Sequence, residues 1–321
     1  MPVYQKISSK IDLVTINNPG TDNLLEWFNV TNAGKNEIEF LRKKFDFDFQ
    51  HLKASAATTF AQRPMLMDEQ NYLFIILHFP ILINGVITAG ELEIFIGRGY
   101  LVTIHNGNLP ALNNLFNLAK KNPESLQSYH LDSSSILLSE IIDRLLQANY
   151  SILDQNGLKI DEVEEIIFSD DQNKAISQIL QLRHNIINIR KILQSHKNIL
   201  KKLREIESSI VPEKEVKDHY SVLIEHSIRI WEVLENQREM IEVLNSTNES
   251  LTNHKLNYIM KTLTVFSVIV FPLTLLAAIF GMNAKYMPFV DGPYGFYIIL
   301  GIMGFMSLLM LVYFSRKKWL K

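Results

Sequence analysis

The sequence predicts an α+β membrane protein, with a soluble N-terminal part that mixes strands and helices and a membrane part made of two C-terminal helices. Two uncharged apolar runs, Thr262 to Ala284 and Gly292 to Ser315, are each long enough to supply the roughly 20 residues that cross a bilayer. Before residue 260 the chain is charged and soluble in character. Its first third carries β-rich runs, and the remainder has apolar residues at helical spacing.

Residues 1–130 are predicted to form a cytoplasmic α/β domain. The runs "NYLFIILHFPIL" and "GELEIFIGRGYLVTIHNG" are β-rich, and Asn84-Gly85 between them is a pair favoured in hairpin turns. We interpret Gly97-Arg98-Gly99 as another turn and not as a phosphate loop, because no Lys-Ser/Thr pair or helix start follows. The opening "MPVYQKISSK" lacks the apolar core of a signal peptide, so we expect the N-terminus to stay in the cytoplasm.

Residues 131–260 are predicted to form a helical stalk region. A first helix begins at the serines of "SSSILLSEIIDRLL", which are N-cap candidates, and a second stretch covers Asn173 to Glu207. A third helix begins near Pro212-Glu213 and meets no stop signal before Pro272, so we expect one helix of roughly 65 to 70 residues, about 100 Å long. Its apolar residues at steps of seven, four and three predict a heptad seam, which consists of Leu223, Ile230, Leu234, Ile241, Leu244 and Leu251.

The cations predict the orientation of the two membrane helices, placed at 261–282 and 295–315. Lys255 and Lys261 precede the first span and a basic tail, 316–321, follows the second, whereas the loop 283–294 holds Lys285 against Asp291. By the positive-inside rule both termini are cytoplasmic and the loop is external. We therefore expect a multi-pass protein of the cell (inner) membrane, with Trp319 at the inner interface and Tyr286, Tyr294 and Tyr297 at the outer one.

One face of the first span collects small and hydroxyl side chains. Steps of four and three residues from Met260 reach Thr264, Ser267, Phe271, Thr274, Ala278 and Gly281, and we call this face the polar stripe. Close helix packing in lipid and a wet pore wall both explain such a face, and periodicity alone leaves both open. Two helices cannot enclose a pore, so a channel built from this chain must be a cyclic homo-oligomer.

The segment "FGMNAKYMP", preceded by "IVFPLTLLAAIFGMN" and followed by a span that ends in "VYFSRKKWLK", resembles the CorA family of magnesium transporters. Gly281-Met282-Asn283 matches the GMN signature of that family, at the outer end of the first of two C-terminal spans. The similarity extends through "RPMLMDEQNYLFIILHFP", "SEIIDRLLQANYSILDQ" and "VPEKEVKDHY", and covers essentially the whole chain.

The resemblance implies a funnel-shaped homopentamer in which the long stalk helix is continuous with the pore helix. It implies a channel for hydrated Mg²⁺, with Asn283 as the main selectivity residue and with Gly281 and Met282 shaping the loop. Thr274 would then form an inner ring of hydroxyls. Met260, Leu263 and Phe271 are candidates for an apolar constriction that gates by dewetting, in a pore also lined by Thr264, Ser267 and Ala278. Phe289-Val290 after Met287-Pro288 departs from the family pattern and leaves the preferred ion open among Mg²⁺, Co²⁺, Ni²⁺ and Zn²⁺.

Relatives of this kind bind regulatory Mg²⁺ through acids on the soluble domain and the stalk. This chain keeps only part of that pattern of acids. Leu77 to Ala89 contains no acid, and the stalk position that would pair with it aligns with Val222. Asp218 and Glu225 remain as candidate regulatory metal ligands, against the alternative that they are solvated surface acids. The neighbouring His219 and His226 raise the further alternative of a transition-metal site, although no third ligand is identifiable.

Two other classes of protein are weighed against a channel. A membrane-anchored enzyme is disfavoured because no nucleophile elbow, metalloprotease helix or phosphate loop occurs. The absence of cysteine excludes disulfides and thiolate metal sites. A membrane-anchored coiled-coil scaffold or sensor remains the alternative, together with a member of the same family that prefers Zn²⁺ or Ni²⁺. The expected partners are further copies of the chain, the lipid bilayer and divalent cations, with no nucleic acid.

Overall fold

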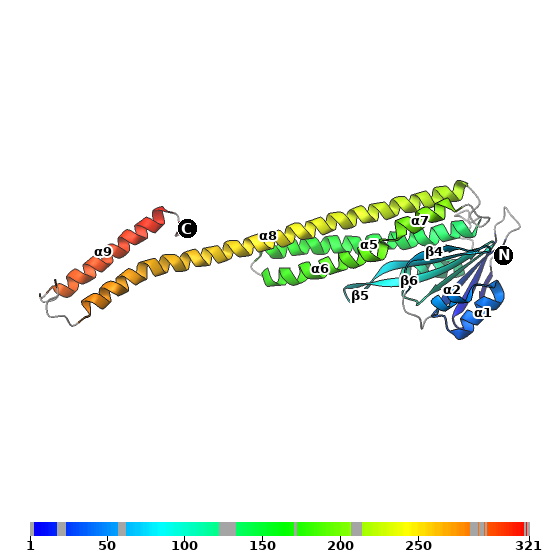
Figure 1. The fold of residues 1–321 in the computed structure, drawn as a ribbon, viewed down its shortest axis with the longest axis horizontal. Coiled ribbons are helices and arrows are strands. Elements are labelled where there is room, and N and C mark those ends of the chain that lie inside the picture. The colour runs from blue at the N-terminus through cyan, green and yellow to red at the C-terminus, as the bar shows by residue number, and fades with distance from the viewer. Residues whose placement is uncertain are drawn as a thin grey trace. The chain divides into compact units, whose positions relative to one another are not determined.

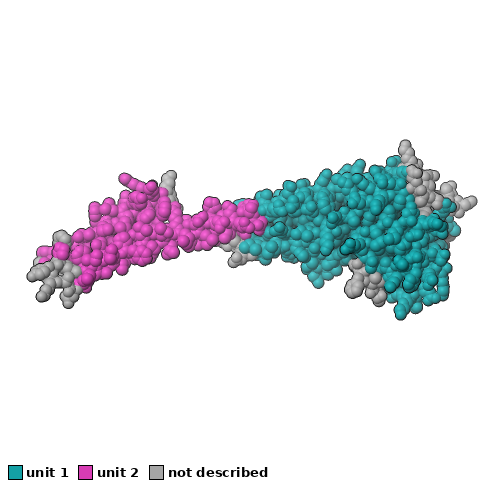
Figure 2. Space-filling view, in the orientation of Figure 1, with its two compact units in different colours: residues 1–244 teal, residues 245–321 magenta. Residues whose placement is uncertain are grey.

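A computed structural model describes residues 3–17, 24–56, 62–121, 133–169, 172–206, 214–282, 288, 292, 294–317 and 319. The chain divides into two compact units, which we call the N-terminal unit (residues 1–244) and the C-terminal unit (residues 245–321) (Figure 2). Each unit is described by itself. The division falls inside the longest helix, upstream of the change in composition near residue 260.

The N-terminal unit is built on a seven-stranded sheet with the order β1-β2-β3-β7-β6-β5-β4 (Figure 1). Strands β3 and β7 pair in parallel, and every other neighbouring pair is antiparallel. The strands are β1 (Val3–Lys6), β2 (Ile11–Asn17), β3 (Leu24–Thr31), β4 (Met65–Asp68), β5 (Leu73–Ile83), β6 (Val86–Gly97) and β7 (Tyr100–His105).

Both predicted turns in this sheet are confirmed. Asn84 and Gly85 have φ values of 51° and 80° and join Ile83 to Val86, as a two-residue hairpin turn with two positive φ angles requires. Arg98 and Gly99 join Gly97 to Tyr100, with Gly99 at φ 72°. The Gly-Arg-Gly segment is therefore a turn between antiparallel strands.

Helices cover both faces of the sheet. On one face, α1 (Lys35–Phe45) and α2 (Phe49–Ala54) enclose a core that includes Phe28, Phe74 and Phe95. On the other face, α3 (Pro110–Lys121) sets Phe116 edge-on against Trp27, with ring centroids 4.9 Å apart. The indole nitrogen of Trp27 donates to Thr103 Oγ1 at 3.1 Å, so the buried donor is satisfied.

The predicted first stalk helix is α5 (Ser134–Phe168), and its N-cap is Ser133, whose hydroxyl accepts from the Ile136 amide at 3.3 Å. The second predicted helical stretch is divided into two helices, α6 (Gln172–Leu193) and α7 (His196–Glu205), by a break at Gln194 and Ser195. At the break, His196 enters the core, stacks edge-on against Phe79 and donates from Nε2 to the carbonyl of His78 at 2.7 Å. Burial lowers the pKa of His196 to about 4, which keeps the imidazole neutral.

The third stalk helix is α8 (Lys214–Phe280), with 67 residues, as the sequence predicted. Its seam residues from Leu223 to Leu244 are buried, and Leu251 is half-buried. Within the N-terminal unit, α8 lies alongside α5 and α6: Tyr220 donates to the Ser135 carbonyl at 3.1 Å, and Arg190 forms an ion pair with Glu235 at 2.8 Å (Figure 1). The seam thus packs on helices of its own chain.

Candidate functional site

Among the described residues, two helices are long and apolar enough to cross a membrane: the C-terminal part of α8 and α9 (Gly295–Arg316). At 1.5 Å per residue, the 22 residues of α9 extend about 33 Å, which matches a hydrocarbon core of about 30 Å. Pro272 lies inside α8 without ending it. The side chains of both helices are largely exposed in the single chain, as expected for surfaces that face lipid or other copies.

In the C-terminal unit, α9 covers one face of α8. Val265 on α8 and Phe314 on α9 are buried, and Lys261 Nζ lies 5.8 Å from the ring centroid of Trp319. The face of Val265 continues at helical spacing through three half-buried residues, Ile269, Leu276 and Phe280. At 100° per residue this covered face is centred on the side of α8 opposite the polar stripe.

The polar stripe is consequently left uncovered within the chain. Six of the residues predicted to line a pore are exposed, and Ser267 is half-buried. The exposed ones are Met260, Leu263, Thr264, Phe271, Thr274 and Ala278. The structure therefore places them on one open helix face, with no partner from α9.

The threonine hydroxyls on the stripe have a defined orientation. Thr264 Oγ1 donates to the Met260 carbonyl at 2.7 Å, and Thr274 Oγ1 donates to the Val270 carbonyl at 2.9 Å. Because each hydroxyl proton is committed to the preceding turn, the oxygen lone pairs remain as acceptors on the outer side. Water molecules around a cation present hydrogens outward, so these oxygens suit a hydrated cation.

The helix ends where the sequence predicted a pore mouth. Gly281 N donates to the Ala277 carbonyl at 2.9 Å and Met282 N to the Ile279 carbonyl at 3.2 Å, so two carbonyls of the last turn have partners. Gly281 does not have a positive φ; a Cβ atom there would lie 3.1 Å from the Ala277 carbonyl oxygen, a tight approach. The predicted selectivity residue Asn283 lies outside the described residues, as do Lys285, Tyr286 and Met287.

The candidate regulatory acids do not converge in one chain. Asp218 and Glu225 are exposed on α8 and lie seven residues apart, which is about 10 Å along the helix. Glu225 Oε2 lies 3.7 Å from Arg229 Nη2, with both side chains exposed. Among the described residues, no group of three or more acidic, histidine or cysteine side chains is placed to hold a metal ion.

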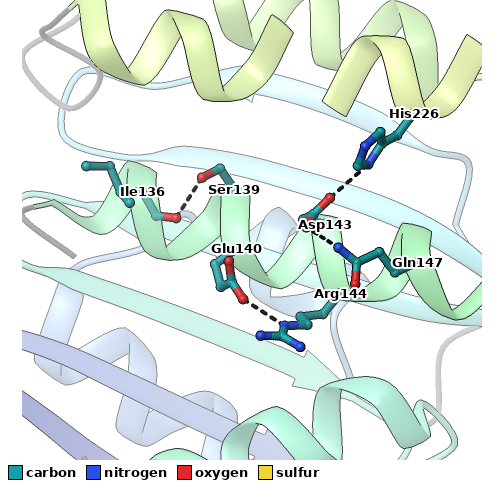
Figure 3. Close-up of polar contacts among 7 residues, drawn as sticks. All are labelled: Ile136, Ser139, Glu140, Asp143, Arg144, Gln147 and His226. Carbon is teal, nitrogen blue, oxygen red and sulfur yellow. Dashed lines mark hydrogen bonds and ion pairs between the residues drawn. The ribbon is translucent and has the colours of Figure 1, made fainter. Parts of the chain in front are cut away.

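His226 contacts Asp143, whereas the sequence suggested a metal site that His226 would share with Glu225. Its Nδ1 lies 2.9 Å from Asp143 Oδ1 on α5, and the other oxygen of Asp143 accepts from Gln147 Nε2 at 2.6 Å (Figure 3). The imidazole thus links α8 to α5 and does not join Glu225 in a metal site. The sequence offered no signal for this pair, because 83 residues separate its members.

A second group of titratable residues lies at the paired strands β5 and β6. His78 Nε2 lies 3.0 Å from Glu91 Oε2, which also accepts from the Gln62 amide at 3.0 Å. Burial raises the pKa of Glu93 well above its usual range, and a hydrogen bond to Glu91 and the negative charge of Glu91 add to the effect. Burial alone would raise the pKa of Glu91, but hydrogen bonds from His78 and Glu93 lower it. Glu93 is therefore the member of the pair that keeps its proton to the higher pH.

We expect the free energy of unfolding of the wild type to fall as pH rises through the titration of Glu93. Glu93→Gln should not show this fall. Since the folded state holds the Glu93 proton more tightly than the unfolded state, the free energy of unfolding falls as pH increases from the unfolded pKa towards the folded one, by up to about 1.4 kcal/mol per pH unit. Gln keeps the donor to Glu91 without a titratable proton. Thermal unfolding between pH 5 and 9 should show the variant gaining on the wild type at high pH.

The matched control is Glu164→Gln, which changes an exposed acid on α5. It should leave the pH dependence of unfolding as in the wild type. A wild-type stability that does not fall relative to Glu93→Gln as pH rises would contradict a raised pKa of Glu93.

Comparison with known proteins points to one family. The family described as CorA-like Mg²⁺ transporter protein matches residues 22–317. YfjQ of Bacillus subtilis, named as a metal ion transporter, is 25% identical over 92% of this chain and 90% of its own length. The cobalt/magnesium transport protein of Thermotoga maritima is 32% identical over 57% of this chain and 52% of its own.

The fold also matches a solved structure over nearly its whole length. The complete structure of the magnesium transporter from Methanocaldococcus jannaschii has a TM-score of 0.83 to this chain and is 21% identical, covering 98% of this chain and 100% of the other. At that identity the likeness concerns the fold.

Proposed function

Because the chain belongs to the CorA-like Mg²⁺ transporter family, we propose that it forms a homopentameric channel that passes hydrated Mg²⁺ across the cell membrane. The first span, residues 261–282, lines the pore, and the second, residues 295–315, faces lipid. The external loop, residues 283–294, carries Asn283 at the pore entrance. Both termini lie in the cytoplasm, where the basic residues Lys255, Lys261 and Arg316 flank the spans.

One observation carries the proposal: α9 covers the face of α8 opposite the polar stripe, and the stripe is open. Two helices cannot surround water, so the stripe needs further copies of itself. A cyclic arrangement of α8 helices places Thr264, Ser267 and Thr274 around one axis and leaves α9 outside. This arrangement also keeps the polar groups out of lipid, where each unsatisfied one is costly.

The chemistry of the stripe suits Mg²⁺ with its water shell intact. Mg²⁺ dehydrates reluctantly and keeps several waters, so weak hydrogen bonding to those waters is the cheapest recognition. Rings of Thr274 hydroxyls and Asn283 amide oxygens accept these hydrogen bonds without the deep binding that a carboxylate ring would give. Met260, Leu263 and Phe271 form the apolar narrow part, which stops conduction when it dries.

Asp218 and Glu225 act as regulatory ligands only between copies in this proposal. They lie too far apart along α8 to hold one ion together, and each needs a ligand from a neighbouring subunit. Cytoplasmic Mg²⁺ bound there would hold neighbouring stalk helices together and favour one state of the pore.

The test is ion flux in purified proteoliposomes loaded with a Mg²⁺-sensitive dye. A channel should fill the vesicles down a Mg²⁺ gradient, and competition with Co²⁺, Ni²⁺ and Zn²⁺ ranks the ions, including the alternative of a member that prefers Zn²⁺ or Ni²⁺. A membrane-anchored scaffold or sensor would assemble and move no ion. Flux indistinguishable from empty vesicles for all four cations would end the proposal.

A further inference from the structure

A cleft of about 620 Å³ lies in the N-terminal unit, between the end of β5, the start of α3 and the middle of α5. Its walls are mainly apolar and include Phe79, Ile81, Leu109, Leu145 and Ile152. None of the described residues that line it carries a charge. The volume and the apolar walls are those of small-molecule sites in proteins, which usually add a few convergent polar groups.

Five of the lining residues have polar side chains, and two of these, Asn108 and Asn149, hold buried polar atoms that have no partner. Asn149 lines the cleft with its side chain 1% exposed, and neither its Nδ2 nor its Oδ1 has a hydrogen-bond partner in the protein. Asn108 Oδ1, across the cleft on the segment before α3, is also buried without a partner. Leaving a buried polar group unpaired costs about 1–3 kcal/mol, so such groups normally have a partner from water or a ligand.

The unpaired amide belongs to the same helix face as the apolar wall. Leu145, Ala148, Asn149 and Ile152 are spaced three and four residues apart on α5, so their side chains share one side of the helix. An occupant of the cleft would therefore meet the apolar wall, and a rotation of the buried Asn149 side chain would bring its amide into contact with that occupant. Asn149 offers the two N–H donors of its Nδ2 and the acceptor Oδ1, and Asn108 Oδ1 adds a second acceptor.

We infer that this cleft is a binding site for an uncharged small molecule with a hydrogen-bond donor and acceptor, such as a carboxamide group, on an apolar body. The amide group of the ligand pairs with Asn149, and its body contacts Leu109, Leu145 and Ile152. Anions and cations are disfavoured because the described lining offers no opposite charge. The site lies in the N-terminal unit and depends on no part of the proposed ion pathway.

Benzamide is a suitable probe, and the lack of cysteine in the chain makes the measurement specific. Ser151 is exposed at the cleft, so Ser151→Cys introduces one thiol whose reaction with a maleimide reports on occupancy of the cleft. The full-length protein is labelled in detergent with and without benzamide. The labelling rate should fall by the factor 1 + [L]/Kd, about fourfold at three times Kd.

Three matched controls separate the cleft from general effects. Lys174→Cys, an exposed position on α6, should label at the same rate with or without benzamide, even if benzamide enters the detergent. Benzoate, which has the same ring with a charge, should protect Ser151→Cys much less. Adding Asn149→Leu to Ser151→Cys should abolish protection, and Ala148→Phe, which fills the cleft from an exposed position, should do so even if the leucine variant fails to fold.

Equal labelling of Ser151→Cys with and without benzamide would overturn the inference and would mean that ordered water alone satisfies the two asparagines. Protection that survives both Asn149→Leu and Ala148→Phe would overturn it too, because binding would then lie elsewhere. Neither outcome bears on ion flux.

Discussion

Replacing Asn283 with alanine is expected to abolish most Mg²⁺ flux while the protein still assembles. In the proposed pentamer five amide oxygens at the pore entrance accept hydrogen bonds from the waters of the ion, and each such bond contributes about 0.5–1.5 kcal/mol. Losing the ring should lower flux by at least about tenfold, which corresponds to about 1.4 kcal/mol. Dye-loaded proteoliposomes measure the flux, and native mass spectrometry measures the assembly.

Two further variants sharpen this measurement. Asn283→Gln keeps the amide on a longer side chain, so we expect flux between the wild type and the alanine variant. Asn36→Ala, an exposed change on α1, should leave flux unchanged and controls for reconstitution. An alanine variant that carries Mg²⁺ at the wild-type rate would remove Asn283 from the ion pathway and favour an anchor function for the helical pair.

Local signals predicted the parts of the fold that neighbouring residues decide. The hairpin at Asn84-Gly85, the N-cap at Ser133 and the uninterrupted α8 each follow from short-range chemistry, namely positive φ, a hydroxyl acceptor and the absence of a helix stop. The sequence therefore predicted these elements at nearly the right residues.

Contacts between distant residues were not predictable in this way. The parallel pairing of β3 with β7 joins Trp27 to Leu101, and His196, at the break between α6 and α7, donates to the His78 carbonyl. The pairing of His226 with Asp143 and the raised pKa of Glu93 likewise depend on tertiary packing. Five of the six residues of the predicted heptad seam are buried, but the intramolecular partners of the seam, α5 and α6, could not be chosen from periodicity alone.

The candidate site divides in the same way. Helical periodicity placed Thr264, Phe271 and Thr274 on one face, and the structure shows that this face is open. What the sequence could not supply is the position of α9: Val265 on α8 and Phe314 on α9 are buried, and Val265 lies on the side of α8 opposite the stripe. Periodicity alone left helix packing and a pore as explanations of the stripe. The position of α9 excludes packing of the stripe against the second helix of the same chain.

A hydroxyl deletion tests whether the open stripe carries ions. Thr274→Val keeps the shape of the side chain and removes only the oxygen, and we expect Mg²⁺ flux to fall several-fold because five acceptors facing the hydrated ion are lost together. Thr262→Val is the matched control: Thr262 is also exposed on α8 and donates to the Tyr258 carbonyl at 3.0 Å, but it lies off the stripe.

The comparison between the two variants separates the effect of the residue's position on α8 from the effect of losing a hydroxyl group. Both lose a hydroxyl that bonds the carbonyl four residues earlier, so any change in helix stability is shared. A lower flux in Thr274→Val alone therefore reports the side of α8 that faces the ion. If both variants conduct equally, or if Thr262→Val conducts less, α8 presents a different face to the pore and the hydroxyls of the stripe serve helix packing in lipid.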